Sequence, residues 1–129
     1  MAQILVADGD PQIRDTVRTL LLYMGFEVSA TGDSSAIMQM LAENEYDLVI
    51  LDMFMPGLEG LETIRALRRR FPNTPIIAMS GMVFPEQRVA TPDFLAMATK
   101  LGATASLHKP FAPHDLLVAV EACVSGSLH

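Results

Sequence analysis

Hydrophobic residues in this chain fall in short continuous runs separated by amphipathic stretches. Three runs, at residues 4–7, 48–51 and 76–79, are apolar throughout. Continuous apolar runs of this length are typical of strands buried on both faces of a parallel sheet. Two further runs, 26–30 and 103–108, alternate between apolar and polar residues. We predict that these two form strands at the sheet edges, where one face is exposed.

The segments between the predicted strands carry apolar residues at helical spacing. The first of these stripes ends at Gly25, a residue type favoured just beyond a helix C-terminus. Pro72 is expected to close the third helix, Thr91-Pro92-Asp93 indicates the N-cap and first residue of the fourth, and Pro113 indicates the start of the fifth. The apolar positions of the five predicted helices are Ile13, Val17, Leu20, Leu21 and Met24; Ile37, Met40 and Leu41; Leu61, Ile64 and Leu67; Leu95, Ala98 and Leu101; and Leu116, Leu117, Val120 and Val124.

Five strands that alternate with five helices predict an α/β fold. We expect a flavodoxin-like, doubly wound, five-stranded parallel sheet with strand order 2-1-3-4-5 and helices on both faces. With 129 residues, half of them hydrophobic, the chain is long enough for one sizeable core and too short for two. We therefore predict a single domain over residues 1–129, with its core at about 3–124.

Charge and cysteine content narrow the classes of partner and compartment. A formal net charge of −6 argues against nucleic-acid binding by this chain. The basic run Arg68–Arg70 is interpreted as the solvated C-terminal end of a helix. A single cysteine, Cys123, excludes an internal disulfide and fits a reducing compartment. Residues 1–3 lack the basic region of a secretory signal, and no apolar run approaches the roughly 20 residues of a spanning helix. We therefore expect a cytoplasmic protein without a membrane partner.

Four of the predicted strands are followed by residues with chemically useful side chains. These are Asp8, with Asp10 close behind, then Asp52, Ser80 and Lys109. Ligands of doubly wound sheets bind beyond the carboxyl ends of the strands, near the switch point between the first and third strands. Carboxylates that gather there repel one another unless a cation joins them, and Mg²⁺ accepts a small number of oxygen ligands. A site that holds a metal ion beside a carboxylate and a lysine is suited to binding a phosphoryl group.

Three segments on these strands resemble the receiver domains of two-component response regulators. LVILDMFMPGLEG (48–60) resembles the strand of the family that carries the phosphoacceptor, with its Met-Pro-Gly loop. PIIAMSG (75–81) resembles the strand with the switch hydroxyl, and LGATASLHKPF (101–111) resembles the segment with the Lys-Pro-Phe sequence. The resemblance covers about residues 3–124. It is closest to stand-alone receivers of the chemotaxis-regulator type, although a receiver cut from a longer protein stays open.

The resemblance implies a role for each of the four rim residues, Asp8, Asp52, Ser80 and Lys109, which follow the predicted strands. Asp52 would be the phosphoacceptor. Mg²⁺ would be held by Asp52, by Asp8 and by the backbone carbonyl of Phe54. Lys109 would pair with a phosphoryl oxygen, and Ser80 would hydrogen-bond the phosphoryl group and so report its arrival. Such a protein is a signalling module rather than an enzyme, apart from its own phosphorylation and dephosphorylation at Asp52.

The resemblance also implies partners and one backbone feature. The phosphoryl donor would be a histidine kinase or phosphotransfer protein, and the phosphorylated form would dock to an unknown downstream protein. The bond between Lys109 and Pro110 would be cis, a form that only about 5–6% of X-Pro bonds adopt.

The sequence departs from the family at three places. The family usually has two adjacent acids after the first strand, whereas this chain has Asp8 followed by Gly9, so one metal ligand is absent and weaker Mg²⁺ binding is expected. An aromatic residue that often precedes the lysine by three positions is replaced by Ser106. The segment between Ser80 and Lys109 is longer than usual, and we expect a protruding loop there in which Val83-Phe84 contacts a partner or packs down.

These departures leave alternatives open. Asp10 is expected to be the N-cap of the first helix, with Pro11 as its first residue, rather than a metal ligand. Gly9 and Ser106 support a degenerate receiver that binds a partner without phosphorylation. The sequence DGDP (8–11) also resembles the Asp-x-Asp motif of haloacid-dehalogenase-like phosphatases, in which Asp8 would be the nucleophile and Asp10 the general acid.

Overall fold

The computed structural model describes residues 2–55, 60–81 and 94–124. The elements in chain order are β1 (Gln3–Ala7), α1 (Pro11–Tyr23), β2 (Glu27–Thr31), a short 3₁₀ helix η1 (Ser34–Ala36), α2 (Ile37–Glu43), β3 (Leu48–Asp52), α3 (Gly60–Arg70), β4 (Ile76–Ser80), α4 (Phe94–Leu101), β5 (Ala105–His108) and α5 (Pro113–Val124). All strands are parallel, in the order β2-β1-β3-β4-β5, which confirms the predicted doubly wound sheet. No helix within these residues is long and apolar enough to cross a bilayer.

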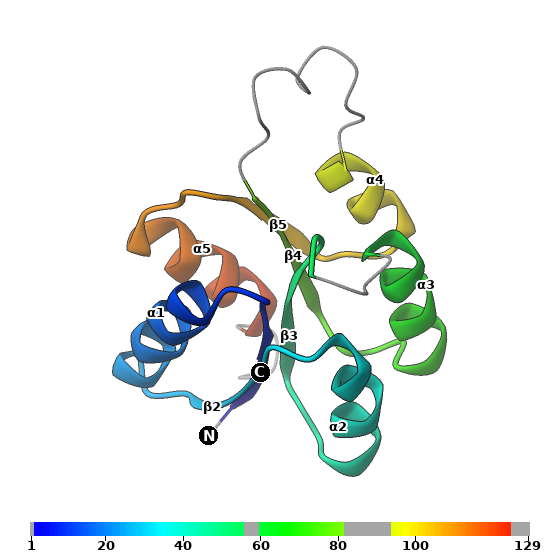
Figure 1. Cartoon of the computed structure of the whole chain (residues 1–129), viewed down its shortest axis with the longest axis horizontal. Helices are drawn as coiled ribbons and strands as arrows, with labels where there is room; N and C mark the ends of the chain where they lie inside the picture. The colour runs from blue at the N-terminus through cyan, green and yellow to red at the C-terminus, as the bar shows by residue number, and fades with distance from the viewer. Residues whose placement is uncertain (1, 56–59, 82–93, 125–129) are drawn as a thin grey trace.

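The sheet separates two hydrophobic cores, one on each face. Figure 1 shows α1 and α5 on one side of the sheet and α2, α3 and α4 on the other. Successive strand residues point to opposite faces. In β1, for example, Ile4 and Val6 pack in the core beneath α1 and α5, whereas Leu5 and Ala7 pack in the core beneath α2, α3 and α4. The central strands are buried on both faces, as their continuous apolar runs predicted.

Capping residues fix the ends of the first helix as predicted. The Asp10 carboxylate accepts a hydrogen bond of 2.9 Å from the Gln12 N–H, and Pro11 is the first helical residue. After the helix, Gly25 has φ +95°, a left-handed conformation that glycine adopts without steric cost. The Lys109–Pro110 bond is cis, as the family resemblance implied.

Element boundaries differ from the sequence prediction mainly at the edge strands. β2 begins one residue later than predicted and extends to Thr31, and β5 is confined to Ala105–His108. Edge strands carry a weaker hydrophobic signal because one face meets solvent, so their ends are harder to predict. The predicted helix N-cap at 91–93, the side chain of Leu95 and the Val83-Phe84 loop lie outside the described residues.

The basic run in the last turn of α3 is only partly the solvated helix end that the sequence predicted. Arg69 and Arg70 are exposed, but Arg68 is half-buried. Its guanidinium donates to the carbonyl of Gly102 at 2.7 and 3.1 Å, and to the carbonyls of Pro72 at 2.8 Å and Thr74 at 3.0 Å. A single side chain thus joins the end of α3 to the loops that precede β4 and β5.

Replacing Arg68 by methionine is expected to lower the free energy of unfolding by about 3 kcal/mol, because charge-assisted bonds to carbonyls are lost and those carbonyls keep no equivalent partner. Urea denaturation measures this loss. The matched control is Arg69→Met, which removes the same charge from an exposed neighbour and should change stability by less than about 0.5 kcal/mol. Equal effects of the two substitutions would contradict the role given to Arg68.

Candidate functional site

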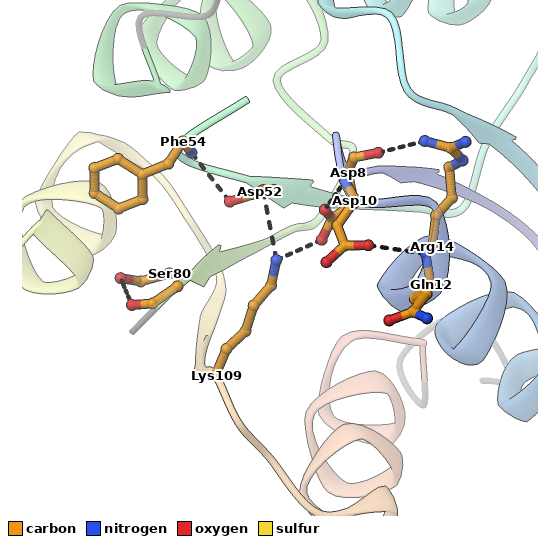
Figure 2. A network of polar contacts seen from close by, with 9 residues as sticks. Asp8, Asp10, Gln12, Arg14, Asp52, Phe54, Ser80 and Lys109 are labelled. Carbon is orange, nitrogen blue, oxygen red and sulfur yellow. Dashed lines mark hydrogen bonds and ion pairs between the residues drawn. The ribbon is translucent and has the colours of Figure 1, made fainter. Parts of the chain in front are cut away.

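The alternation of side chains along the strands determines which rim residues meet. Asp52 follows Leu48 and Ile50 on the face beneath α1 and α5, and Lys109 follows Leu107 on the same face. Asp8 continues the same alternation from Ile4 and Val6. We therefore find three of the four predicted rim residues directed to one side of the sheet, where Figure 2 shows their side chains converging.

Lys109 forms the centre of this group. Its ammonium lies 2.5 Å from Oδ2 of Asp8 and 3.5 Å from Oδ2 of Asp52. All three side chains are buried, with residue exposures of 0% for Asp8, 7% for Asp52 and 8% for Lys109. An ammonium between two buried carboxylates neutralises part of their mutual repulsion. The pairing joins residues that are 101 positions apart in the sequence.

Every polar group of Asp8 has a partner. Its N–H donates to the carbonyl of Thr31 at 3.2 Å, and its own carbonyl accepts from the Arg14 guanidinium at 2.8 Å. Its carboxylate accepts from the Asp10 N–H at 2.9 Å as well as from Lys109. Asp8 is therefore held by its backbone and by its side chain.

Burial raises the pKa of the Asp52 carboxyl above its ordinary value. The hydrogen bond from the Phe54 N–H, 3.0 Å long, and the charge of Lys109 lower this pKa, whereas the charge of Asp8 raises it. Since desolvation is the largest of these effects, the ionised form of Asp52 benefits from any further cation that enters the site.

Ser80 lies on the opposite face of the sheet from the three charged residues by the same alternation. It is 5% exposed, and its hydroxyl donates a long hydrogen bond of 3.3 Å to the carbonyl of Gly81. The carbonyl of Ser80 accepts the Lys109 N–H at 2.8 Å, so the two residues are linked through the backbone. A hydroxyl with so weak a bond has little to lose when it turns toward a new acceptor.

A cleft of about 720 Å³ opens above the charged group. Its walls include Gly9, Gln12 and Thr16 at the start of α1, and Phe54 and Phe111 from the loops after β3 and β5. Phe54 is half exposed. Asp8, Asp52 and Lys109 all line the cleft, so a ligand from solvent has access to the charged group.

The donor set for a metal is smaller than in the usual receiver pattern. Within the described ranges, no group of three or more His, Cys, Asp or Glu side chains is placed to hold a metal ion. Asp10 binds the Gln12 N–H, and Gly9 offers no side chain. Two carboxylates, from Asp8 and Asp52, face the cleft, and such a set fits an ion such as Mg²⁺ that keeps several water ligands.

The comparisons with known proteins identify the family. A family model described as the response regulator receiver domain matches residues 4–121. The chain belongs to this family. Response regulator MprA of Mycobacterium sp. (strain KMS) is 35% identical over 120 residues, which cover 93% of this chain and 49% of that protein. MprA of Mycobacterium leprae (strain TN) is 33% identical over 120 residues, which cover 93% of this chain and 50% of that protein. This receiver thus spans about half the length of the curated relatives it matches.

Solved receiver structures superpose on nearly the whole chain. A response regulator receiver domain protein from Clostridium thermocellum has a TM-score of 0.84 and 30% identity, covering 99% of this chain and 98% of that one. Chemotaxis protein CheY4 of Vibrio cholerae has a TM-score of 0.79 and 29% identity, covering 95% of this chain and 98% of that one. Both likenesses agree with the doubly wound sheet and place the protein in two-component signalling.

The geometry argues against the phosphatase interpretation of residues 8–11. That mechanism needs an accessible Asp8 and a free acid at Asp10. Instead, Asp8 is fully buried against Lys109, and the Asp10 carboxylate caps α1. Membership of the receiver family and the contacts of Asp8 and Asp10 both argue against a phosphatase.

The sequence analysis missed two residues that bear on the site. Arg14 donates to the Asp8 carbonyl from the first half of α1. Gly32 lies against the Arg14 guanidinium, where a Cβ would be 2.2 Å from Nη1. Two features of the sequence could have pointed to them. Arg14 comes six residues after Asp8, and Gly32 comes directly after the edge strand β2.

Proposed function

We propose that this receiver accepts a phosphoryl group on Asp52 and passes the signal on by docking to a partner protein. The observation that carries the proposal is the Lys109 ammonium, which lies 3.5 Å from the Asp52 carboxylate at the base of an open cleft. Asp52 is the acid that the cleft exposes to a donor, and Lys109 is placed to pair with a phosphoryl oxygen. Positioning and charge neutralisation supply most of the catalysis in phosphoryl transfer.

In the proposed reaction, an oxygen of the Asp52 carboxylate forms a bond to phosphorus while the phosphorus–nitrogen bond of a phosphohistidine breaks. The electron pair of that bond stays with the imidazole, which takes up a proton from solvent. Lys109 neutralises charge on the transferred group, and Ser80 turns its hydroxyl from Gly81 toward a phosphoryl oxygen. The Phe54 N–H, which already binds Asp52, holds the nucleophile in place.

The residues that would hold Mg²⁺ are Asp8, Asp52 and the backbone carbonyl of Phe54. When bound, Mg²⁺ supplies positive charge against the phosphoryl oxygens. We propose that its affinity is reduced by Gly9, because the chain offers two carboxylates and Lys109 already bridges them.

The proposed partners follow from this chemistry. The donor is a histidine kinase or a phosphotransfer protein, and the acceptor of the signal is a downstream protein. We further propose that the chain forms one receiver domain over residues 1–129 and works in the cytoplasm. The free thiol of Cys123, whose pKa is raised by burial, would stay reduced there.

A second candidate function is an interaction module that works without phosphorylation. The observation in its favour is that the Lys109 ammonium pairs with both Asp8 and Asp52. In this case the closed ion-pair group would be the working state, and partner affinity would not depend on a phosphoryl donor.

Intact-mass measurement after incubation with acetyl phosphate and Mg²⁺ separates the two candidates. The proposal predicts that the protein gains one phosphoryl group, that hydroxylamine removes it, and that Asp52→Asn gains none. Asp47→Asn is the matched control, since Asp47 lies at the opposite end of β3, and it should be labelled as the parent chain is. A parent chain that gains no mass at saturating donor and Mg²⁺ would favour the interaction module.

A further inference from the structure

The backbone around Asp8 is held by a side chain from outside the acidic group. The Arg14 guanidinium donates through Nη1 to the Asp8 carbonyl at 2.8 Å. Figure 2 shows Arg14 on the far side of Asp8 from Lys109. Because the bond is charge-assisted, it is among the stronger hydrogen bonds that a backbone carbonyl can accept. Asp8 is therefore fixed from both sides, by Lys109 at its carboxylate and by Arg14 at its carbonyl.

Gly32 makes room for this bond. A Cβ at position 32 would lie 2.2 Å from Nη1 and 3.0 Å from Cζ of Arg14. The φ angle of Gly32 is not in the left-handed region, which among the described glycines only Gly25 and Gly102 occupy. The absence of a side chain at position 32 is thus explained by the space that the guanidinium needs, rather than by backbone conformation.

The bond matters because Gly9 follows Asp8. The carbonyl that Arg14 binds belongs to the Asp8–Gly9 peptide, and glycine allows its backbone more conformations than any other residue. A shift in this peptide would move the Asp8 carboxylate relative to Lys109 and would break its bond with the Asp10 N–H. The hydrogen bond from Arg14 to the Asp8 carbonyl therefore limits the movement that Gly9 would otherwise allow.

We propose that Arg14 is a positioning residue that holds the Asp8–Gly9 peptide, so that the Asp8 carboxylate stays on Lys109 beside Asp52, and that Gly32 is the space that permits this. The proposal rests on the proposed phosphoryl-acceptor function for its effect on rate. Its geometric part, the placement of Asp8, is independent of that function and is measured separately.

The experiment compares Arg14→Gln, Arg14→Lys and Gly32→Ala with the control Arg18→Gln. Gly32→Ala displaces the guanidinium but keeps its charge, and Arg18 is an exposed arginine one turn further along α1. The structural measurement is site-resolved hydrogen exchange, at the Asp10 amide that binds Asp8 and at the Ile50 amide in the buried strand β3. The functional measurement is the rate of Asp52 labelling as a function of acetyl phosphate concentration.

Arg14→Gln and Gly32→Ala should each speed exchange of the Asp10 amide by about tenfold, because the loss of one charge-assisted bond loosens its acceptor. Exchange at Ile50, corrected for global stability, should not change, and Arg18→Gln should change neither amide. Arg14→Lys keeps a charged donor, so its Asp10 amide should exchange at a rate between those of the parent chain and Arg14→Gln. The maximal labelling rate should fall by about the same factor, with little change in the donor concentration for half-saturation.

Two outcomes would overturn the proposal. Equal changes at Asp10 and Ile50 would show that Arg14 only stabilises the fold, and no change at Asp10 in Gly32→Ala would show that the guanidinium does not hold the peptide. If the exchange results are as expected but the parent chain takes no phosphoryl group, the positioning role stands and the phosphoryl-acceptor function fails.

Discussion

Replacing Lys109 by methionine is expected to lower the free energy of unfolding by about 3–5 kcal/mol near neutral pH, the usual cost of removing one partner from a buried ion pair. The ammonium lies 2.5 Å from the Asp8 carboxylate and 3.5 Å from that of Asp52. Without it, two buried negative charges would face each other. The pKa of Asp52, which burial already raises, would also lose the charge and the hydrogen bond of Lys109, both of which lower it.

The size of this loss should depend on pH in a defined direction. An acid whose pKa is higher in the folded than in the unfolded state binds more protons when folded, so its contribution to stability falls as the pH rises from the unfolded toward the folded pKa. The deficit of Lys109→Met should therefore be smallest well below about pH 4, where Asp52 is protonated in both the folded and the unfolded state, and should grow toward neutrality. Urea denaturation across a pH series measures it.

Magnesium and a second lysine provide the controls for this prediction. Mg²⁺ should restore part of the stability of Lys109→Met and should affect the parent chain less. In the variant, the bound ion would replace the positive charge of the lost Lys109 ammonium beside Asp8 and Asp52. Lys100→Met removes the other lysine of the chain, which is exposed on α4. A deficit for Lys109→Met within about 1 kcal/mol of this control would contradict the ion-pair description.

Introducing aspartate at Gly9 is expected to tighten Mg²⁺ binding by at least about tenfold, since a third carboxylate adds Coulomb attraction for the ion. Gly9 lines the cleft beside Asp8 and is partly exposed, and its φ is not in the left-handed region, so its backbone conformation is one that aspartate also adopts. The same change should lower the stability of the metal-free protein by roughly 1 kcal/mol, because it adds a like charge near Asp8 and Asp52.

The two opposite effects distinguish a metal ligand from a general change in the turn. Isothermal titration calorimetry measures the Mg²⁺ affinity, and urea denaturation without metal measures the stability. Gly9→Ala adds a Cβ without charge and should leave the Mg²⁺ affinity close to that of the parent chain. An unchanged affinity in Gly9→Asp would show that position 9 does not face the ion, and that Gly9 does not account for weaker binding.

The strand order and the approximate position of each rim residue were predictable because they depend on local pattern. Continuous apolar runs identified β1, β3 and β4, and the alternating runs identified β2 and β5 as edges. The runs of β1, β3, β4 and β5 each end at or just before the polar residue that lies at the carboxyl end of that strand. The N-cap role of Asp10 was predictable for the same reason, since Asp-Pro before an amphipathic stretch is a local signal.

The contacts of arginine side chains were not predictable from the sequence. Arg68 was interpreted as part of a solvated basic run, yet it binds the carbonyl of Gly102, 34 positions away. Arg14 was not singled out, yet it binds the carbonyl of Asp8. A long side chain reaches backbone acceptors whose positions depend on the assembled fold, and backbone carbonyls leave no mark in the sequence. The opposite facing of Ser80 and Asp52 follows from strand alternation, but only once the register of β3 and β4 is known.

The Asp8–Lys109 contact brings together the first and last strands in the sequence, although β1 and β5 are not neighbours in the sheet. During synthesis Asp8 and Asp52 emerge long before Lys109 does. Any nascent or partly unravelled chain in which β5 is not yet docked would hold Asp52 without its counter-charge and would be a poor substrate for a donor. If Asp52 accepts a phosphoryl group as proposed, its labelling would therefore require that β5 has docked on the sheet.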